Sequence, residues 1–169
     1  VDGGKGTQAS GGFLGLSLTG RPTVTLASGG GCVAFVADAE NLVPGDTNGT
    51  GDVFVRDRTA RTTERISISS AGVESVLGGE EPGISSNGRF VVWSSEDANL
   101  VAGDTNGRKD AFLRDRSLGI TLRLSVRTYG GEAPAPALLV VGTLPAMSSN
   151  GRFAVFESDS INLAEDETN

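Results

Sequence analysis

The sequence repeats itself, and this feature constrains the fold more than any other. Of the 18 residues from Asn41 to Arg58, 13 are identical at positions 99–116, which lie 58 residues later. A third copy follows at a spacing of 63 residues, where Ser148–Phe153 matches Ser85–Phe90. A fixed period of this length is typical of repeat architectures, in which each unit is one small supersecondary structure. The chain is therefore expected to be an array of similar units.

Each repeat contains short segments with the residue pattern of β-strands. Some are runs of aromatic and β-branched residues, and others alternate apolar with polar residues, as a strand with one buried face does. No segment has the helical period of apolar residues with capping signals. We therefore predict an all-β protein. The expected strand segments are residues 63–69, 82–85, 89–95, 110–114, 120–126 and 144–148, with an outer strand at 13–19.

Two Asn-Gly pairs, Asn87-Gly88 and Asn150-Gly151, predict β-hairpins. This dipeptide favours a type I′ turn, in which both central residues have positive φ. Four short strands per repeat, at a nearly constant period, indicate the blades of a β-propeller. In each blade an inner strand would be followed by the hairpin, a second strand, a long polar loop, a third strand and an outer strand.

The repeat also resembles a known family. Residues 82–93 read Pro-x-Ile-Ser-x-Asn-Gly-Arg-Phe-Val-Val-Trp, and residues 110–115 read Asp-x-Phe-x-Arg-Asp. Together they resemble the WD40-like repeats of TolB-type propellers. Within that group they are similar to a bacterial subset that carries Asn-Leu-Val-x-Gly-Asp-Thr-Asn-Gly-x-x-Asp between the second and third strands. The resemblance covers about residues 13–169 and implies a periplasmic, cell-surface or secreted β-propeller. It indicates fold more specifically than function, because propellers have many functions.

The repeats divide the chain into five parts. We predict an N-terminal extension (1–12), a partial blade with a first inner strand (13–28), repeat 1 (29–81), repeat 2 (82–143) and a partial repeat 3 (144–169). Propellers have about 4–8 blades, so about two complete repeats leave three interpretations. The chain is a fragment of a longer propeller, a short subunit completed by a neighbouring chain, or an open curved array. Open strand edges pair readily with other chains, so we expect a homo-oligomer or a part of a longer chain.

The composition excludes several classes of function. The 169 residues include no His and one Cys, so the chain alone forms no Ser-His-Asp triad, no His-ligated zinc site and no internal disulfide. The net charge of −7 argues against binding a nucleic-acid backbone, and no apolar run is long enough to span a membrane. No nucleophile has an evident base nearby in the sequence. We predict no catalytic residue and no organic cofactor.

The long loop of each repeat is the best candidate for a metal site. Side-chain oxygens at alternating positions of a tight turn, with one backbone carbonyl, form the kind of ligand set that Ca²⁺ takes. We expect the ion to pin the loop structurally. The predicted ligands are Asp46, Asn48, the carbonyl of Thr50 and Asp52 in the first loop, and Asp104, Asn106, the carbonyl of Arg108 and Asp110 in the second.

A second interpretation of these loops involves no ion. Asp and Asn side chains also form Asx turns, in which they accept hydrogen bonds from nearby backbone N–H groups. Arg108 and Lys109 weaken the case for an ion in the second loop, and Lys109 stands where an EF-hand needs its glycine. Both interpretations stay open at this point.

Three function hypotheses follow. The leading one is a non-enzymatic, extracytoplasmic scaffold with calcium-stabilised loops that binds protein or self-assembles through its open blade edges. The second is a propeller that binds carbohydrate or another small ligand. The third is the non-catalytic propeller part of a larger hydrolase. The apolar stretch at residues 133–141 offers a contact surface for the first hypothesis.

Overall fold

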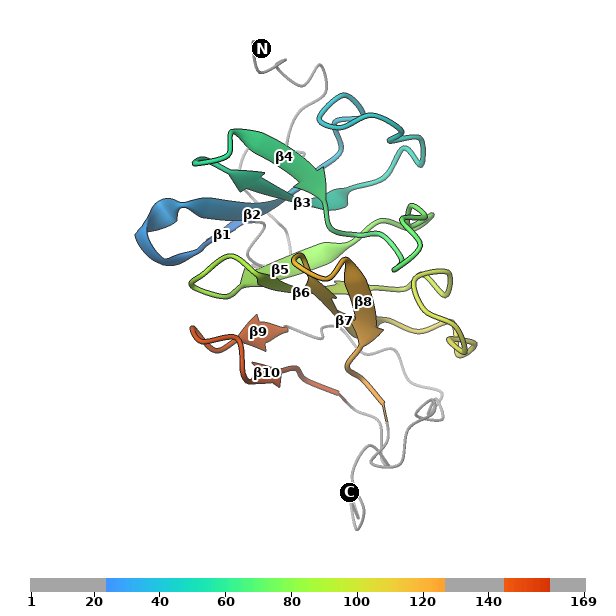
Figure 1. Cartoon of the computed structure of the whole chain (residues 1–169). Helices are drawn as coiled ribbons and strands as arrows, with labels where there is room; N and C mark the ends of the chain where they lie inside the picture. The colour runs from blue at the N-terminus through green and yellow to red at the C-terminus, as the bar shows by residue number, and fades with distance from the viewer. Residues whose placement is uncertain (1–23, 127–144, 159–169) are drawn as a thin grey trace.

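The computed structural model describes residues 24–126 and 145–158. It contains two four-stranded antiparallel sheets and one two-stranded sheet, which follow one another along the chain (Figure 1). The first sheet consists of β1 (Val24–Leu26), β2 (Cys32–Ala37), β3 (Asp52–Asp57) and β4 (Thr62–Arg65), with a short 3₁₀ turn, η1 (Ser28–Gly30), between β1 and β2. The second consists of β5 (Glu80–Ile84), β6 (Phe90–Ser95), β7 (Asp110–Asp115) and β8 (Ile120–Arg123), and the third of β9 (Ala146–Met147) and β10 (Ala154–Val155).

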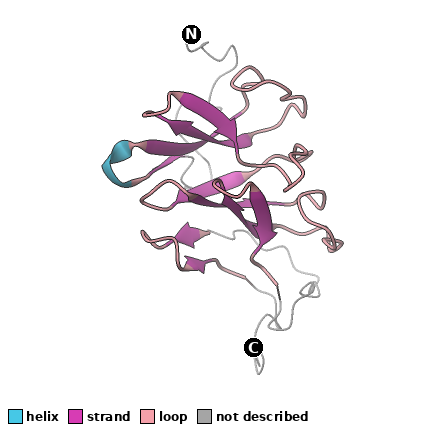
Figure 2. Ribbon diagram, in the orientation of Figure 1, coloured by secondary structure: helices cyan, strands magenta, loops and turns pink. Residues whose placement is uncertain are grey.

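Strands are consecutive neighbours in both complete sheets, in the orders β1-β2-β3-β4 and β5-β6-β7-β8. This meander is the predicted arrangement of a propeller blade. The all-β prediction and the two complete four-stranded blades are confirmed (Figure 2). The expected outer strand at residues 13–19 and the apolar stretch at 133–141 lie outside the described residues.

The outer strands β4 and β8 end earlier than the sequence pattern predicts. After each of these strands, a serine hydroxyl accepts a backbone N–H of the neighbouring strand in place of a backbone carbonyl. Ser67 Oγ accepts the N–H of Val53 at 3.1 Å, and Ser125 Oγ accepts the N–H of Ala111 at 3.1 Å. Because these backbone donors bond to hydroxyl groups instead of strand carbonyls, regular pairing stops at Arg65 and Arg123.

The hairpins lie where the Asn-Gly pairs predicted them, but the predicted turn type is wrong. Gly88 has a φ of 73°, whereas the φ of Asn87 is not positive, and the third sheet repeats this with Gly151 at 70°. The Asn87 side chain explains the difference. Its Oδ1 accepts bonds from Ser85 Oγ and the N–H of Arg89, and the N–H of Gly88 donates to Ser85 O at 2.9 Å. These bonds close a longer loop than a type I′ turn.

The core lies between the two complete sheets. Trp93 is fully buried there, with Val53, Val55 and Ile66 of the first sheet packed in the same cluster. Trp93 therefore packs between the two blades, and Cys32 is buried in the same cluster. The rings of Trp93 and Phe112 stack at 5.6 Å, and Phe35 and Phe54 form the same stack in the first sheet at 5.8 Å. Among the described residues, no helix has the length and hydropathy needed to cross a membrane.

Candidate functional site

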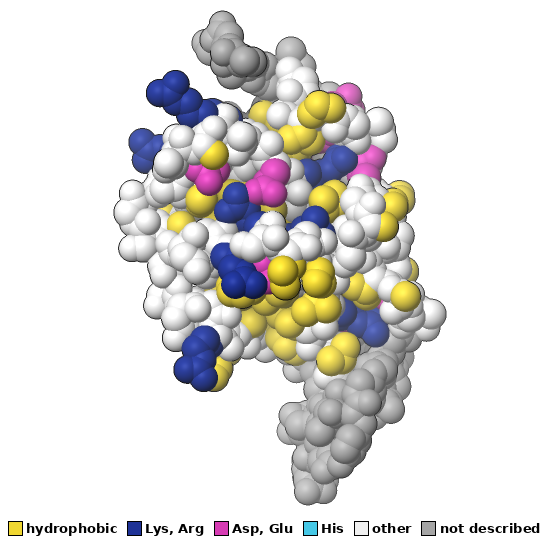
Figure 3. All heavy atoms as spheres, in the orientation of Figure 1, with side chains coloured by type: hydrophobic (Ala, Val, Ile, Leu, Met, Phe, Trp, Pro, Cys, Tyr) yellow, Lys and Arg dark blue, Asp and Glu magenta, His cyan; other side chains and the backbone are white. Residues whose placement is uncertain are grey.

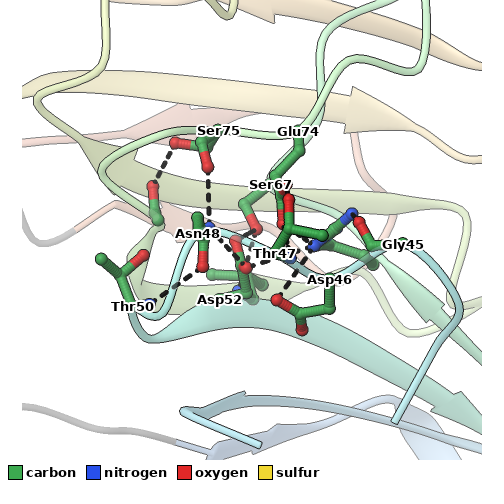
Figure 4. A network of polar contacts seen from close by, with 12 residues as sticks. Gly45, Asp46, Thr47, Asn48, Thr50, Asp52, Ser67, Glu74 and Ser75 are labelled. Carbon is green, nitrogen blue, oxygen red and sulfur yellow. Dashed lines mark hydrogen bonds and ion pairs between the residues drawn. The ribbon is translucent and has the colours of Figure 1, made fainter. Parts of the chain in front are cut away.

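The long loop of the first sheet converges on one arginine. Arg65, at the end of β4, lies among the carboxylates of Asp46, Asp52 and Glu74. Figure 4 shows these three acidic residues gathered in one polar network. Its NH1 is 3.3 Å from Asp46 Oδ1 and 3.5 Å from Asp52 Oδ2, and it forms its closest ion pair with Glu74 Oε1. Its NH2 donates to the carbonyl of Gly45 at 2.8 Å. The guanidinium therefore closes the loop onto the end of the strand.

Hydrogen bonds fix the rest of this loop. Asn48 Oδ1 accepts the N–H of Thr50 at 2.9 Å, which is an Asx turn, and Asn48 Nδ2 donates to Asp52 Oδ2 at 2.8 Å. Thr47 donates both its N–H and its hydroxyl to Glu74, at 2.9 and 2.7 Å. Ser67 donates to the other oxygen of Asp52. The buried Asp52 and Ser67 side chains thus have partners within the network, whereas the buried Oγ1 of Thr50 and Nε of Arg65 have none among the described residues.

The second loop repeats this geometry. Arg123 NH1 lies 3.1 Å from Asp104 Oδ1 and 3.7 Å from Asp110 Oδ2, and its NH2 lies 3.5 Å from the carbonyl of Gly103. Asn106 Oδ1 accepts the N–H of Arg108 at 2.8 Å. Ser125 donates to Asp110 just as Ser67 donates to Asp52. In both loops, therefore, an arginine at the end of the fourth strand pairs with two aspartates of the loop, at equivalent positions of the repeat.

The predicted ligands are brought together, with two changes in their roles. Thr50 and Arg108 enter the network through their backbone N–H groups, and each Asn oxygen accepts that N–H. Three carboxylate oxygens of Asp46, Asp52 and Glu74 lie within 4.8 Å of one another, which is close enough for one cation. Arg65 contacts all three carboxylates, so a metal ion would have to compete with its charge. Calcium binding stays a prediction.

Burial governs the electrostatics of the first loop. Burial raises the pKa of both Asp46 and Asp52 above its ordinary value of 3.8. Neighbouring carboxylates add to the rise, whereas Arg65 opposes it at both groups. At Glu74, burial also acts upward, but bonds from Thr47 and the charge of Arg65 outweigh it and lower the pKa. The arginine therefore offsets part of the cost of holding three carboxylates together.

Sequence reasoning missed the basic and distant members of this network. Arg65, Ser67 and Glu74 all lie outside residues 46–52, the motif from which the calcium ligands were predicted. The repeat period contained the signal, because Arg123, Ser125 and Glu132 stand 58 residues after them. Glu132 itself lies outside the described residues. A search of the aligned repeats for charged positions beyond the motif would have found the arginine and the glutamate.

The segment Arg114–Arg116, which reads Arg-Asp-Arg, contributes to the contact between the two blades. Arg116 of the second sheet pairs with Glu64 of the first, and its NH1 also donates to the carbonyl of Gly88. Asp115 accepts two bonds from Arg89, at 3.0 and 2.6 Å. These bonds from Arg89 are the main cause of the lowered pKa of Asp115. Asp115 and Arg116 are therefore engaged in ion pairs, the first within its own blade and the second across to the first sheet.

Comparison with known proteins adds little to this geometry. No family model matches the sequence, and no curated protein does. Among solved structures, the chain is similar to the crystal structure of TolB from Acinetobacter baumannii, with 16% sequence identity and a TM-score of 0.47. The similarity covers 82% of this chain and 26% of that chain, so this chain spans a small part of the other protein's length. The blade assignment above rests on the pairing of the strands themselves.

Proposed function

We propose that this chain is a non-enzymatic scaffold of propeller blades that binds protein through the uncovered face of its second sheet. The observation that carries this proposal is a group of apolar side chains on that face, which we call the open face: Leu113, Ile120 and Leu122. Leu122 is 51% exposed and Ile120 is 38% exposed, and Leu113 beside them is half-buried. Exposed apolar groups that adjoin one another mark interaction surfaces.

The pairing of the strands places these residues on one face. Leu113 lies opposite both Val92 and Leu122, so all three project from the same side of the sheet. Gly83, also opposite Val92, lies on this side and directly faces Pro145 and Ala146. The inner part of this side is thus covered by the third sheet, and the outer part is the open face. Figure 3 shows hydrophobic side chains gathered over the second sheet.

The first sheet shows how such a face is used. Its equivalents of Leu113 and Leu122 are Val55 and Glu64. Val55 is fully buried against the second sheet, and Glu64 pairs with Arg116 of that sheet. The same position of the blade is therefore a contact surface in one sheet and an exposed surface in the other. Self-association and a location outside the cytoplasm belong to this proposal, and the location rests only on the resemblance of the repeat.

The test compares two surface variants, Leu122→Asp and Leu118→Asp. Leu118 is also exposed but lies in the turn between β7 and β8, beside the open face's strands but outside the face. Native mass spectrometry over a range of concentrations, together with chemical crosslinking to candidate protein partners, measures association. We expect complexes with wild type and Leu118→Asp but not with Leu122→Asp. A 17.3 kDa monomer with no partner, or complexes that Leu122→Asp leaves unchanged, would contradict the proposal.

A further inference from the structure

The sequence contains four Asn-Gly pairs, and the fold places them in two different settings. Asn87-Gly88 and Asn150-Gly151 form hairpin tips, whereas Asn48-Gly49 and Asn106-Gly107 lie in the long loops. In such a pair the backbone nitrogen of the glycine can attack the side-chain amide carbon of the asparagine, because glycine has no Cβ to hinder the approach. Since the dipeptide is the same at all four places, differences in its reactivity come from the fold.

The state of the glycine N–H, the attacking group, separates the two settings. The backbone conformation does not, because all four glycines have positive φ, between 60° and 73°. At the tips the N–H is engaged: that of Gly88 donates to Ser85 O at 2.9 Å, and the third tip repeats this bond at 2.9 Å. In the loops, neither the N–H of Gly49 nor that of Gly107 has an acceptor among the described residues.

Packing around the glycine differs in the same direction. Gly88 is buried, and a Cβ there would stand 2.8 Å from Cys32 Sγ, while the equivalent position of the third tip lies against a phenylalanine ring. Gly49 and Gly107 are exposed, and beyond its neighbours in the chain a Cβ at either would meet no described atom within 4 Å. The attacking nitrogen has to turn toward the asparagine side chain. This movement displaces packed neighbours at the tips but not in the loops.

The asparagine amide of the loop is also activated for attack. Asn48 Oδ1 accepts the N–H of Thr50 at 2.9 Å (Figure 4), and the second loop repeats this bond at 2.8 Å. Such a donor stabilises the negative charge that develops on the oxygen as the amide carbon is attacked. Asn87 Oδ1 is an acceptor as well, so this activation is common to both settings. The accessible glycine nitrogen is therefore what distinguishes the loops.

We propose that Asn48-Gly49 and Asn106-Gly107 are sites of spontaneous deamidation through a cyclic imide. The glycine nitrogen forms a bond to Cγ of the asparagine, the bond from Cγ to Nδ2 breaks, and the glycine N–H proton leaves with Nδ2 as ammonia. Water then adds to either carbonyl carbon of the imide and opens the ring, so the products are aspartate and isoaspartate. Water is the co-reactant. This modification concerns the loops and does not depend on the open face.

The product changes the network around the first loop. The Nδ2 group of Asn48 donates to Asp52 Oδ2 at 2.8 Å and to Ser75 O at 2.7 Å. An ionised carboxylate has no proton to donate, so both bonds are lost on deamidation. The new negative charge also faces the carboxylate of Asp52, which like charge disfavours. Deamidation therefore replaces a side chain that closes the loop with one that repels it.

The experiment compares the folded protein with the same chain unfolded in urea. Both samples are incubated at mildly alkaline pH in water enriched in heavy oxygen, which labels each newly formed carboxyl group, and peptide mass spectrometry measures all four pairs. In the folded protein the loop pairs should convert about tenfold faster than the tip pairs, because a tip must first lose a hydrogen bond and its packing. In urea all four pairs should convert at similar rates, since the fold no longer protects any of them.

Two variants sharpen the test. In Asn48→Gln the longer side chain would have to close a less favourable six-membered ring, so labelling at position 48 should stop while labelling at Asn106 continues. Asn48→Asp carries the product side chain and should lower the midpoint of urea unfolding, and an unchanged midpoint would contradict the loss of loop closure. Loop pairs that convert no faster than tip pairs in the folded protein would overturn the inference. So would loop pairs that convert only in urea.

These outcomes are separate from those of the proposed function. Deamidation is read from the mass of each peptide, whereas the proposed function is read from complexes and their response to Leu122→Asp. Either result can therefore fail without the other.

Discussion

The two complete sheets agree at their long loops and differ at their hairpin tips. At the loops, Arg65 and Arg123 hold equivalent carboxylates in equivalent ways. At the tips, the first sheet has Gly31-Cys32 where the second has Arg89-Phe90. The arginine–aspartate pairs that close the loop within one blade are therefore the same in both repeats. The tip residues that contact the next blade differ between them.

The change at the tip has a packing reason. Cys32 lies against Gly88, and a Cβ on that glycine would stand 2.8 Å from Cys32 Sγ. The small Cys32 side chain leaves room for the second tip and for Arg116, whose NH1 is 3.7 Å from Sγ. A phenylalanine at position 32 would fill this space. Contacts between blades thus vary with the neighbour, whereas contacts within a blade recur.

Equivalent aromatic positions give the largest expected contrast. Trp93→Ala removes a fully buried ring between the sheets and should lower the free energy of unfolding by about 3–5 kcal/mol. Phe35→Ala removes a half-buried ring at the same position of the first sheet and should cost about 1–2 kcal/mol. Urea unfolding followed by circular dichroism measures both without relying on tryptophan fluorescence. Equal losses would show that the two positions are packed alike.

Removing the central arginine tests the loop network. Arg65→Met leaves Asp46, Asp52 and Glu74 without their cation and should cost about 3 kcal/mol, because the charges are largely buried. Arg58→Met, on the exposed turn after β3, is the control and should change stability by no more than about 0.5 kcal/mol. Thermal and urea unfolding measure the difference. A small effect of Arg65→Met would mean that the network does not stabilise the loop.

Asp52→Ala separates the arginine network from calcium. Loss of the buried carboxylate should cost about 1–3 kcal/mol, because Ser67 and Asn48 lose their acceptor. Since Arg65 supplies the positive charge, we expect the same loss in calcium and in chelator. Differential scanning calorimetry under both conditions measures it. A loss that appears only in calcium would confirm the calcium prediction instead, and Asp110→Ala extends the same test to the second loop.

The position after the second strand also differs between the repeats, where Ala39 corresponds to Asp97. Asp97 accepts bonds from Ser75 Oγ and from the N–H groups of Leu77 and Asn99. Burial acts to raise its pKa, but these bonds outweigh it and lower the pKa below 3.8. A lowered pKa in the folded state means that Asp97 stabilises the fold above pH 3.8 and loses this effect as the pH falls further.

Asp97→Asn should therefore cost about 1–3 kcal/mol at neutral pH, because the amide replaces one acceptor oxygen with a donor. The difference from wild type should shrink as the pH falls below 3.8. Unfolding by urea at a series of pH values measures this dependence, with Glu96→Gln, an exposed neighbour, as the control. A difference that stays constant with pH would mean that the carboxylate charge is not what stabilises the turn.

The smallest expected contrast is between two glycines at equivalent positions of the tips. Gly30 and Gly88 both have positive φ, at 66° and 73°, so alanine should cost about 1 kcal/mol at either position. Gly88→Ala should cost about 1 kcal/mol more, because its Cβ also meets Cys32. The double variant Cys32→Ala with Gly88→Ala should remove that excess. Urea unfolding of the three variants measures it, and an excess that persists would place its cause elsewhere.

The sequence by itself determined the fold class, the blades and the loops that matter. Alternation at residues 63–69 and 120–126 predicts a strand in each repeat, and β4 and β8 lie there, although they end at Arg65 and Arg123. The motif at residues 46–52 also identified Asp46, Asn48 and Asp52 as a cluster, which the structure brings together. Local patterns of this kind are decided by residues close in sequence.

Only the tertiary structure decided what holds the cluster and which face is uncovered. Arg65 and Glu74 reach Asp52 from 13 and 22 residues away, through the return of β4 and the loop after it. The side chain of Asn87 accepts hydrogen bonds from Ser85 and Arg89, and these bonds stabilise a longer loop in place of the type I′ turn that the Asn-Gly pair predicted. Val55 is fully buried and its equivalent Leu113 is half-buried, because a four-stranded blade packs over Val55, whereas the described residues on the side of Leu113 form a two-stranded sheet. Such differences depend on the neighbouring blade, which no local sequence pattern contains.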